Sequence, residues 1–135
     1  MAQSEVDETV IALFRARRDI PGMHRERLLL LTTTGARTGA PHTTPMMFHR
    51  EGGMLMVIAS NNGAASDPHW VHNLRANPTV RVEIGDDDYA ATAAELDARQ
   101  RPGLWDRITR LYPFFAEHQG RTARQIPVVA LERTG

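Results

Sequence analysis

The sequence predicts a mainly β (α+β) domain: a small, mostly antiparallel barrel of six strands with two to three flanking helices. Six short segments rich in β-branched and apolar residues recur along the chain, and turn residues rather than helices separate most of them. The strand–helix–strand alternation that a Rossmann domain needs is missing, and the chain has no internal repeat. A length of 135 residues is enough for one domain with a hydrophobic core. The strands are expected over 27–34, 42–48, 54–60, 80–84, 89–96 and 126–131. Helices are expected over 1–19 and 102–111, with a short helix or helical turn over 69–77 and a further turn of helix over 114–119.

The N-terminal helix is expected because Val6, Val10 and Phe14 recur at helical spacing. Acidic residues come early in this segment and arginines come late, which is the order that the helix dipole favours. Residues 1–22 are therefore expected to form a helical leader, and residues 23–135 a barrel domain. The leader could dock on the barrel, cover a pocket, or make a weak contact with a membrane surface.

The stretch 28–45, LLLLTTTGARTGAPHTTP, should contain the first two strands, because leucines and threonines favour extended structure. Gly35 and Gly39 provide the backbone freedom for a turn between them. Arg37 and Thr38 lie inside that turn. Such a loop can bind a phosphate through backbone N–H groups and a bidentate guanidinium. It can also be a plain hairpin whose arginine is solvated.

The later strands differ in pattern. The segment 54–60, MLMVIAS, is apolar throughout, so it should be buried on both faces. The polar segment 61–68 that follows is rich in small residues, which is typical of a binding loop. Residues 80–84 alternate as VRVEI, and the three acidic residues 86–88 suit a solvated hairpin tip better than a metal site. The last strand, 126–131, is expected to close the sheet.

Composition excludes several classes of function. Sixteen basic and sixteen acidic side chains cancel, so no overall field attracts nucleic acid. All sixteen basic residues are arginine, and the chain has no cysteine. It therefore has no disulfide, thiolate metal site or cysteine nucleophile, which fits a reducing compartment. We expect a cytoplasmic protein, at most peripheral to a membrane through the N-terminal helix.

The residues offer no self-sufficient catalytic set. His69 and His72 lie three apart in a predicted helix, but no third ligand has a convincing spacing, so no metal site is expected. Ser60 and Ser66 lack the G-x-S-x-G context of a hydrolase nucleophile. Without such a set, the chain is expected either to bind a cofactor that supplies the reactive group or to be a non-catalytic binding module.

Three runs of sequence carry a resemblance: LLLLTTTGARTGAPHTTPMMF, VIASNNGAASDPHWVHNLRANPTVRVEI and LYPFFAEHQGRTARQIPVVAL. In this order they resemble the deazaflavin-dependent nitroreductase family, whose members are split β-barrel oxidoreductases that bind coenzyme F420. The resemblance covers about three quarters of the chain. It implies a six-stranded split β-barrel that binds F420 in a groove.

The resemblance also implies a set of site residues. The loop Gly35–Gly39 would bind the phosphate and acidic oligoglutamate arm of the coenzyme, and two further segments would line the deazaflavin ring. Trp70 and Asn73 would hold the helix against the ring and the loop, and Arg121 and Arg124 would pair with the coenzyme or brace the barrel. The implied cofactor-binding residues are Gly35, Arg37, Thr38, Gly39, Pro45, Met46, Met47, Ser60, Asn61, Asn62, Gly63, Trp70, Asn73, Arg121 and Arg124.

The chain departs from the family pattern at three positions, Ala36, Asn61 and His118. Ala36 and Asn61 stand where similar proteins carry basic residues, which weakens the expected hold on the acidic arm and leaves flavin mononucleotide (FMN) as an alternative cofactor. Tyr112 is the tyrosine that remains in the tail, and His118 stands where another tyrosine is usual. Tyr112 and His118 are the candidate proton donors.

The function expected from the resemblance is hydride transfer from reduced deazaflavin to a quinone, a nitroaromatic or an activated double bond. Two alternatives remain, namely an FMN-binding reductase of the same architecture and a non-catalytic F420 carrier. The expected partner is a small-molecule electron acceptor, and the chain could be a monomer or a homodimer.

Overall fold

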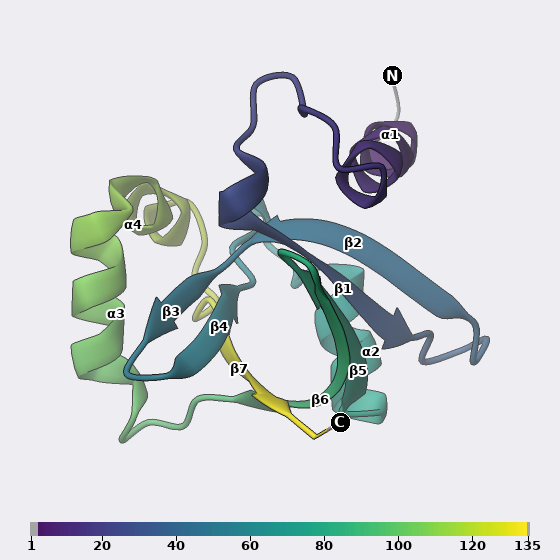
Figure 1. Cartoon of the computed structure of the whole chain (residues 1–135). Coiled ribbons are helices and arrows are strands. Elements are labelled where there is room, and N and C mark those ends of the chain that lie inside the picture. Colours follow the sequence, from purple (N-terminus) through teal and green to yellow (C-terminus); the bar gives the residue numbers. More distant parts are fainter. Residues whose placement is uncertain (1–2, 135) are drawn as a thin grey trace.

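The computed structural model describes residues 3–134 (Figure 1). In chain order the elements are α1 (Gln3–Arg15), η1 (Arg25–Arg27), β1 (Leu28–Thr34), β2 (Pro41–Met47), β3 (His49–Glu51), β4 (Met54–Ile58), η2 (Asn61–Gly63), α2 (His69–Ala76), β5 (Thr79–Ile84), β6 (Asp87–Glu95), α3 (Arg101–Leu111), α4 (Pro113–Gly120) and β7 (Val128–Arg133). The strands form one sheet in the order β2-β1-β5-β6-β7-β4-β3, and every neighbouring pair is antiparallel. The predicted mainly β, antiparallel class is confirmed. The predicted counts are wrong, because the described residues form seven strands and four α-helices.

The additional strand is β3, which follows β2 after the single residue Phe48. The sequence analysis missed it because three residues are too short to show strand periodicity. β2 is one edge of the sheet and β3 is the other. The chain from Pro41 to Glu51 therefore passes from one edge to the other across the top of Figure 1, and the sheet curls into an open barrel.

The four leucines of β1 are buried on both faces of the sheet. Leu29 and Leu31 belong to the core inside the barrel, which also contains the inward residues of β4, β5, β6 and β7. Leu28 and Leu30 face outward and pack with Phe14 of α1. An apolar run without alternation is the pattern expected for a strand that is covered on both sides.

The predicted N-terminal helix is confirmed over residues 3–15, while Met1 and Ala2 lie outside the described residues. Its apolar side chains Val10 and Phe14 pack against β1, and the Arg15 guanidinium forms a 2.8 Å ion pair with Glu83 of β5. While these side chains are packed in this cluster, they are not available to lie in a membrane interface. No helix among residues 3–134 is long and apolar enough to cross a membrane.

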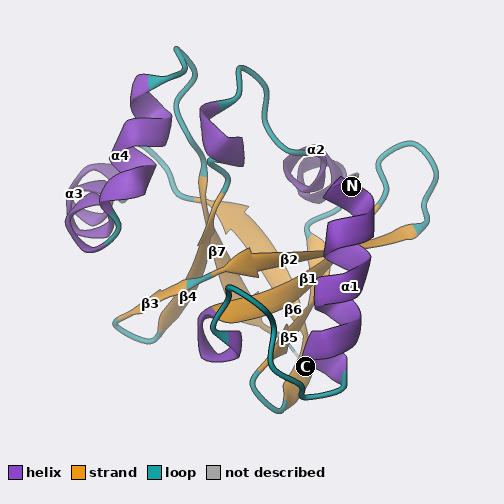
Figure 2. Cartoon of the chain, turned by 90° about the horizontal axis from the view of Figure 1, so that it is seen from above, coloured by secondary structure: helices purple, strands orange, loops and turns teal. Residues whose placement is uncertain are grey.

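A third apolar cluster joins α3 and α4 to the outer face of the sheet. Met56 of β4 and Val128 of β7 pack there against Leu104, Ile108 and Phe115. The expected burial of strand 54–60 on both faces is confirmed for its central residues, 55–57. Figure 2 shows α3 and α4 on one side of the barrel and α1 and α2 on the other.

Candidate functional site

A groove of about 830 Å³ lies between α1, α2 and the loop that joins β1 to β2. This volume is within the range of small-molecule sites, about 300–1,000 Å³. We call it the Arg37 groove, and its lining residues are Asp7, Glu8, Ile11, Gly35, Ala36, Arg37, Thr38, His42, Thr43, Thr44, His69, Trp70, His72 and Asn73. A second hollow of about 620 Å³ lies against β3, β4, β6 and β7, but none of the predicted site residues lines it.

The loop between β1 and β2 is held in shape from α2. Asn73 is 8% exposed, and its Oδ1 accepts a 3.0 Å hydrogen bond from the backbone N–H of Ala36. Its Nδ2 donates a 3.1 Å hydrogen bond to the hydroxyl of Thr33. The loop closes on itself, since the N–H of Gly35 donates to the carbonyl of Ala40. Because both ends of the Asn73 amide are used in this way, Asn73 positions the loop.

Arg37 and Thr38 lie at the exposed tip of this loop. The guanidinium of Arg37 forms no ion pair with any residue in the described range 3–134. The hydroxyl of Thr38 accepts a 3.2 Å hydrogen bond from the N–H of Ala40. An exposed arginine without a carboxylate partner, beside hydroxyls and a folded loop, can bind an anion bidentately.

The segment from Ser60 to Gly63 contains the short helix η2, which contacts α4. Asn61 and Asn62 have left-handed φ values of 48° and 55°. Gly63 is buried, with a φ of 77°, and its α-carbon faces the carbonyl oxygen of His118 on α4. The predicted ring-binding loop is therefore a turn packed against α4, and its residues do not line the Arg37 groove.

Arg124 braces this turn from the C-terminal segment. Its side chain is 14% exposed and donates to the carbonyl oxygens of Ala59 (3.3 Å), Ser60 (2.8 Å) and Ala64 (2.9 Å). The same guanidinium forms a 2.8 Å ion pair with Asp67. All its hydrogen bonds and its ion pair within residues 3–134 are internal, an arrangement that holds the segment 59–67 to the C-terminal segment.

Arg121 is exposed, and its guanidinium reaches the carbonyl oxygen of Asn62 at 3.4 Å. The three residues Pro45, Met46 and Met47 are half-buried in the edge strand β2. Met46 packs against the core inside the barrel, whereas Met47 packs against the α1 cluster, because successive side chains of a strand point to opposite faces. None of these four residues lines the Arg37 groove.

Tyr112 lies between α3 and α4, beside the aromatic rings of Phe114 and Phe115. Its hydroxyl is 3.3 Å from Nδ1 of His49, which is 6% exposed.

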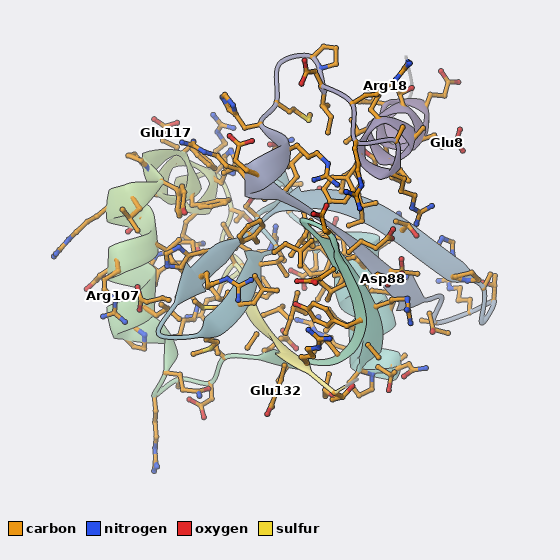
Figure 3. All side chains as sticks on the ribbon, in the orientation of Figure 1. Glu8, Arg18, Asp88, Arg107, Glu117 and Glu132 are labelled. Carbon is orange, nitrogen blue, oxygen red and sulfur yellow. The ribbon has the colours of Figure 1, made fainter. Side chains whose placement is uncertain are left out.

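Nε2 of His49 is 3.4 Å from a carboxylate oxygen of Glu51. A hydrogen bond from Arg107, which projects from α3 in Figure 3, lowers the pKa of Glu51 and keeps it an anion. Since a carboxylate can only accept, Nε2 of His49 is the donor in this contact.

His118 lies on α4, and its Nδ1 is buried without a hydrogen-bond partner among the described residues. The structure thus brings most of the predicted residues into two groups, while Gly39 and the β2 residues Pro45, Met46 and Met47 belong to neither. Gly35, Arg37, Thr38, Trp70 and Asn73 line the Arg37 groove. The residues Ser60, Asn61, Asn62, Gly63, Tyr112, His118, Arg121 and Arg124 gather around η2 and α4.

The sequence analysis missed part of the lining of the Arg37 groove. Asp7 and Glu8 reach it from α1, His42 from the start of β2, and His69 and His72 from α2. The three-residue spacing of His69 and His72 predicted that they share a helix face, but nothing local indicated what that face meets. The groove combines the Arg37 guanidinium, which forms no ion pair within residues 3–134, with hydroxyls and a folded loop, a set of groups that can bind an anion; Asp7 and Glu8 add two carboxylates to the same lining.

Comparison with known proteins agrees with this architecture. The model of the F420H(2)-dependent quinone reductase family matches residues 14–133. An F420H(2)-dependent quinone reductase of Mycobacterium tuberculosis is 37% identical over 108 residues, which is 78% of this chain and 72% of that protein. Among solved structures, an F420-H2 dependent reductase superimposes with a TM-score of 0.71 at 38% identity, covering 82% of this chain and 100% of the other. A chain described as a domain-swapped dimer has a TM-score of 0.73 at 36% identity, covering 93% and 94%.

The family model covers nearly the whole described chain, and the two solved structures share its fold at 36% and 38% identity. The resemblance that the motifs predicted is therefore confirmed. This chain belongs to the F420H(2)-dependent quinone reductase family and is an F420-dependent oxidoreductase with a split-barrel fold.

Proposed function

We propose that this chain transfers a hydride from reduced F420 to a quinone and binds the phosphate and oligoglutamate arm of the coenzyme in the Arg37 groove. The observation that carries the proposal is the free guanidinium of Arg37 in a groove of about 830 Å³. The relatives are described as F420H(2)-dependent quinone reductases, which supports a quinone as the acceptor. When bound, the coenzyme supplies the hydride, while the protein positions donor and acceptor and excludes water.

The remaining roles in this proposal follow from the positions of the side chains. Thr38 and the glycines of the loop, Gly35 and Gly39, bind the phosphate together with Arg37. The half-buried residues 45–47 of β2 and the turn Ser60–Gly63 contact the ring. Trp70 and Asn73 keep α2 and the loop in place, as the two hydrogen bonds of the Asn73 amide support. Arg121 lies on the protein surface beside Asn62, and Arg124 braces the turn Ser60–Gly63.

The proposal is tested by mixing the purified chain with reduced F420 and menadione and following the return of the oxidised F420 absorbance. Turnover supports the proposal, and nitroaromatics and enones tested alongside would rank the acceptors. Tight F420 binding without turnover on any of these acceptors would indicate a carrier instead. A preparation that is yellow and binds FMN but not F420 would indicate the FMN-dependent alternative.

Replacing Arg37 with alanine is expected to weaken F420 binding about 10- to 100-fold, because a charge-assisted contact with an anion is lost. The matched control is Arg99→Ala, since the Arg99 side chain is exposed and lies outside the groove. Dissociation constants from fluorescence titration at low and high salt measure both variants. The difference between wild type and Arg37→Ala should shrink as salt rises, because screening weakens exposed charge interactions. Equal effects of the two substitutions would contradict the assignment of the groove.

Tyr112 is the proposed proton donor, because its hydroxyl carries a proton and is hydrogen-bonded to His49 at the junction of α3 and α4. Replacing Tyr112 with phenylalanine should lower kcat for quinone reduction about 100-fold while leaving F420 affinity unchanged. Steady-state kinetics with F420 at saturation measure this. His118→Gln serves as the comparison, since His118 is the other candidate donor on α4. If neither substitution lowers kcat, then solvent supplies the proton.

The relative described as a domain-swapped dimer supports a homodimer for this chain as well. Light scattering of the purified protein distinguishes a monomer of 15.1 kDa from a dimer of twice that mass. If the protein is a monomer at all concentrations, the proposed homodimer is wrong for this chain.

A further inference from the structure

We propose that His42, His69 and His72 act with Arg37 as contacts for the anionic arm of F420, so that the affinity for the arm rises as the pH falls. This inference rests on the proposed function, which places that arm in the Arg37 groove. It gives a role to three side chains that neither the sequence motifs nor the proposed reaction uses.

The three histidines reach the groove from two elements. His69 and His72 are both exposed, lie in the first turns of α2 and share one face of the helix, because they are three residues apart. His42 stands at the start of β2 and packs against the loop. A β-carbon at Gly35 would lie only 3.0 Å from Nε2 of His42. All three line the same groove as Arg37.

The arrangement does not suit a metal ion. No group of three histidine, cysteine, aspartate or glutamate side chains within residues 3–134 has the geometry to hold one. The three imidazoles therefore do not converge on a point, although they share the groove. Cationic groups distributed along a groove suit an extended ligand with several negative charges, such as a phosphodiester followed by glutamate carboxylates.

The sign of the charge in the groove depends on the imidazoles. The other titratable lining residues are Arg37, Asp7 and Glu8, and the two acidic residues come from α1. With neutral imidazoles the lining carries one positive and two negative side chains. With three imidazolium groups it carries four positive and the same two negative side chains. Histidine is the side chain whose charge changes between about pH 5 and 8, whereas the phosphodiester and carboxylates of the arm stay ionised through most of that range.

The charge change matters because the loop carries a single guanidinium. Arg37 is the one basic residue between Gly35 and Gly39. Three histidines in the same groove can supply further positive charge at low pH but not at high pH. An exposed ion pair contributes roughly a factor of 1.5 to 5 in affinity, so three protonations should give about a tenfold change.

The experiment measures F420 binding by the full chain at constant ionic strength from pH 8.0 to pH 5.5, conditions in which imidazole protonates. The wild-type dissociation constant is expected to fall about tenfold over this range. A variant with His42→Gln, His69→Gln and His72→Gln should lose most of this dependence and should bind at pH 5.5 about as weakly as the wild type binds at pH 8.0. The three substituted side chains are exposed, and far-UV circular dichroism checks that the variant is folded.

Two controls test whether the pH dependence of F420 binding comes from the groove histidines rather than from other titrating groups. His24→Gln should retain the wild-type pH dependence, because His24 is exposed beside Glu26 and does not line the groove. The deazaflavin chromophore without phosphate and glutamates ionises on its ring as F420 does, so the pH dependence of its binding should be the same for the wild type and the triple variant.

Glu8→Gln should tighten F420 binding at both pH values, because it removes a negative charge from the groove. Glu8 projects from α1 in Figure 3.

The outcomes distinguish this inference from the proposed function. If the triple variant keeps the wild-type pH dependence, or if the wild type has none, the inference is overturned while F420 binding itself stands. If F420 does not bind at either pH, or if Arg37→Ala has no effect, the proposed position of the arm fails, and the inference fails with it.

Discussion

Replacing Gly63 with alanine is expected to lower the free energy of unfolding by about 2–5 kcal/mol, the sum of a left-handed backbone penalty and an overpacking penalty. The φ of Gly63 is +77°, a conformation that disfavours a β-carbon. A β-carbon built there would lie 2.6 Å from the backbone carbonyl oxygen of His118 and 2.8 Å from Cβ of Arg121. Neither neighbour is the end of a flexible side chain, so α4 or the η2 turn must move.

The matched control for this substitution is Gly53→Ala. Gly53 has nearly the same backbone angle, with a φ of +81°, but nothing lies within 4 Å of a β-carbon built on it. Its substitution should cost only the backbone penalty, about 1–2 kcal/mol. Urea denaturation of the two variants, with m values checked for equality, measures the difference. Equal losses would show that η2 and α4 are not tightly packed.

The Gly63 substitution should also affect turnover. The proposed ring-binding segment Ser60–Gly63 is the part that must shift, whereas the Arg37 groove does not share these residues. We therefore expect Gly63→Ala to lower kcat for menadione reduction while the salt dependence of F420 binding is retained. A variant that loses stability but keeps full kcat would show that the turn does not position the ring.

Replacing Arg124 with methionine is expected to lower the free energy of unfolding by about 3–5 kcal/mol, because one partner of a largely buried charge pair is removed. The three carbonyl oxygens of residues 59, 60 and 64 lose their donor, and Asp67 loses its closest cation. Methionine approximates the volume of the arginine stem, so the loss reports the polar contacts rather than a cavity.

Arg75→Met is the control for Arg124→Met. Arg75 also pairs with Asp67, at 3.1 Å, and with Glu95, at 2.7 Å, but its side chain is 42% exposed. Solvent screens such a pair, so its loss should cost only about 0–1 kcal/mol. The Arg75 guanidinium lowers the pKa of Glu95, so this small contribution is present above the ordinary Glu range and is lost as the pH falls through the folded-state pKa.

The Arg124 experiment also decides between the two roles that the resemblance left open. If Arg124 braces the turn, the substitution lowers stability, and any loss of F420 binding follows from the displaced turn. If stability is unchanged while F420 binding is abolished, Arg124 contacts the coenzyme instead, and the internal contacts described here contribute little.

The strands that could be predicted are those whose pattern is local. The unbroken leucines of β1 and the apolar run of β4 each indicated a strand buried on both faces, and α1 and the α3–α4 pair supply the outer cover. The short strand β3 could not be predicted, because its residues 49–51 gain strand structure only by pairing with β4. A three-residue segment carries too little periodicity to reveal a partner that the fold brings to it.

The candidate site likewise has features that the local sequence indicates and features that only the fold sets. The family resemblance implied the turn Ser60–Gly63. The local sequence pattern indicated the loop with Arg37, the polar segment 61–68 and the helix face of His69 and His72. It could not indicate that Asp7 and Glu8 of α1 line the same groove, because no local pattern relates residues so far apart in sequence. Nor could it separate Arg124 as a brace from Arg124 as a ligand, since that depends on which carbonyl oxygens surround it.

The sequence by itself determined the mainly β class, the two buried strands and, through three motifs in order, the F420 family. These are properties of residue type and spacing, which short segments carry in full. Only the tertiary structure decided that β2 runs into β3 and joins the two edges of the sheet, and that Gly63 packs against α4. It also decided that a cationic loop, three histidines and two carboxylates face one groove. The physical reason is that burial, close approach and the balance of charge depend on distances between segments, and folding alone sets those distances.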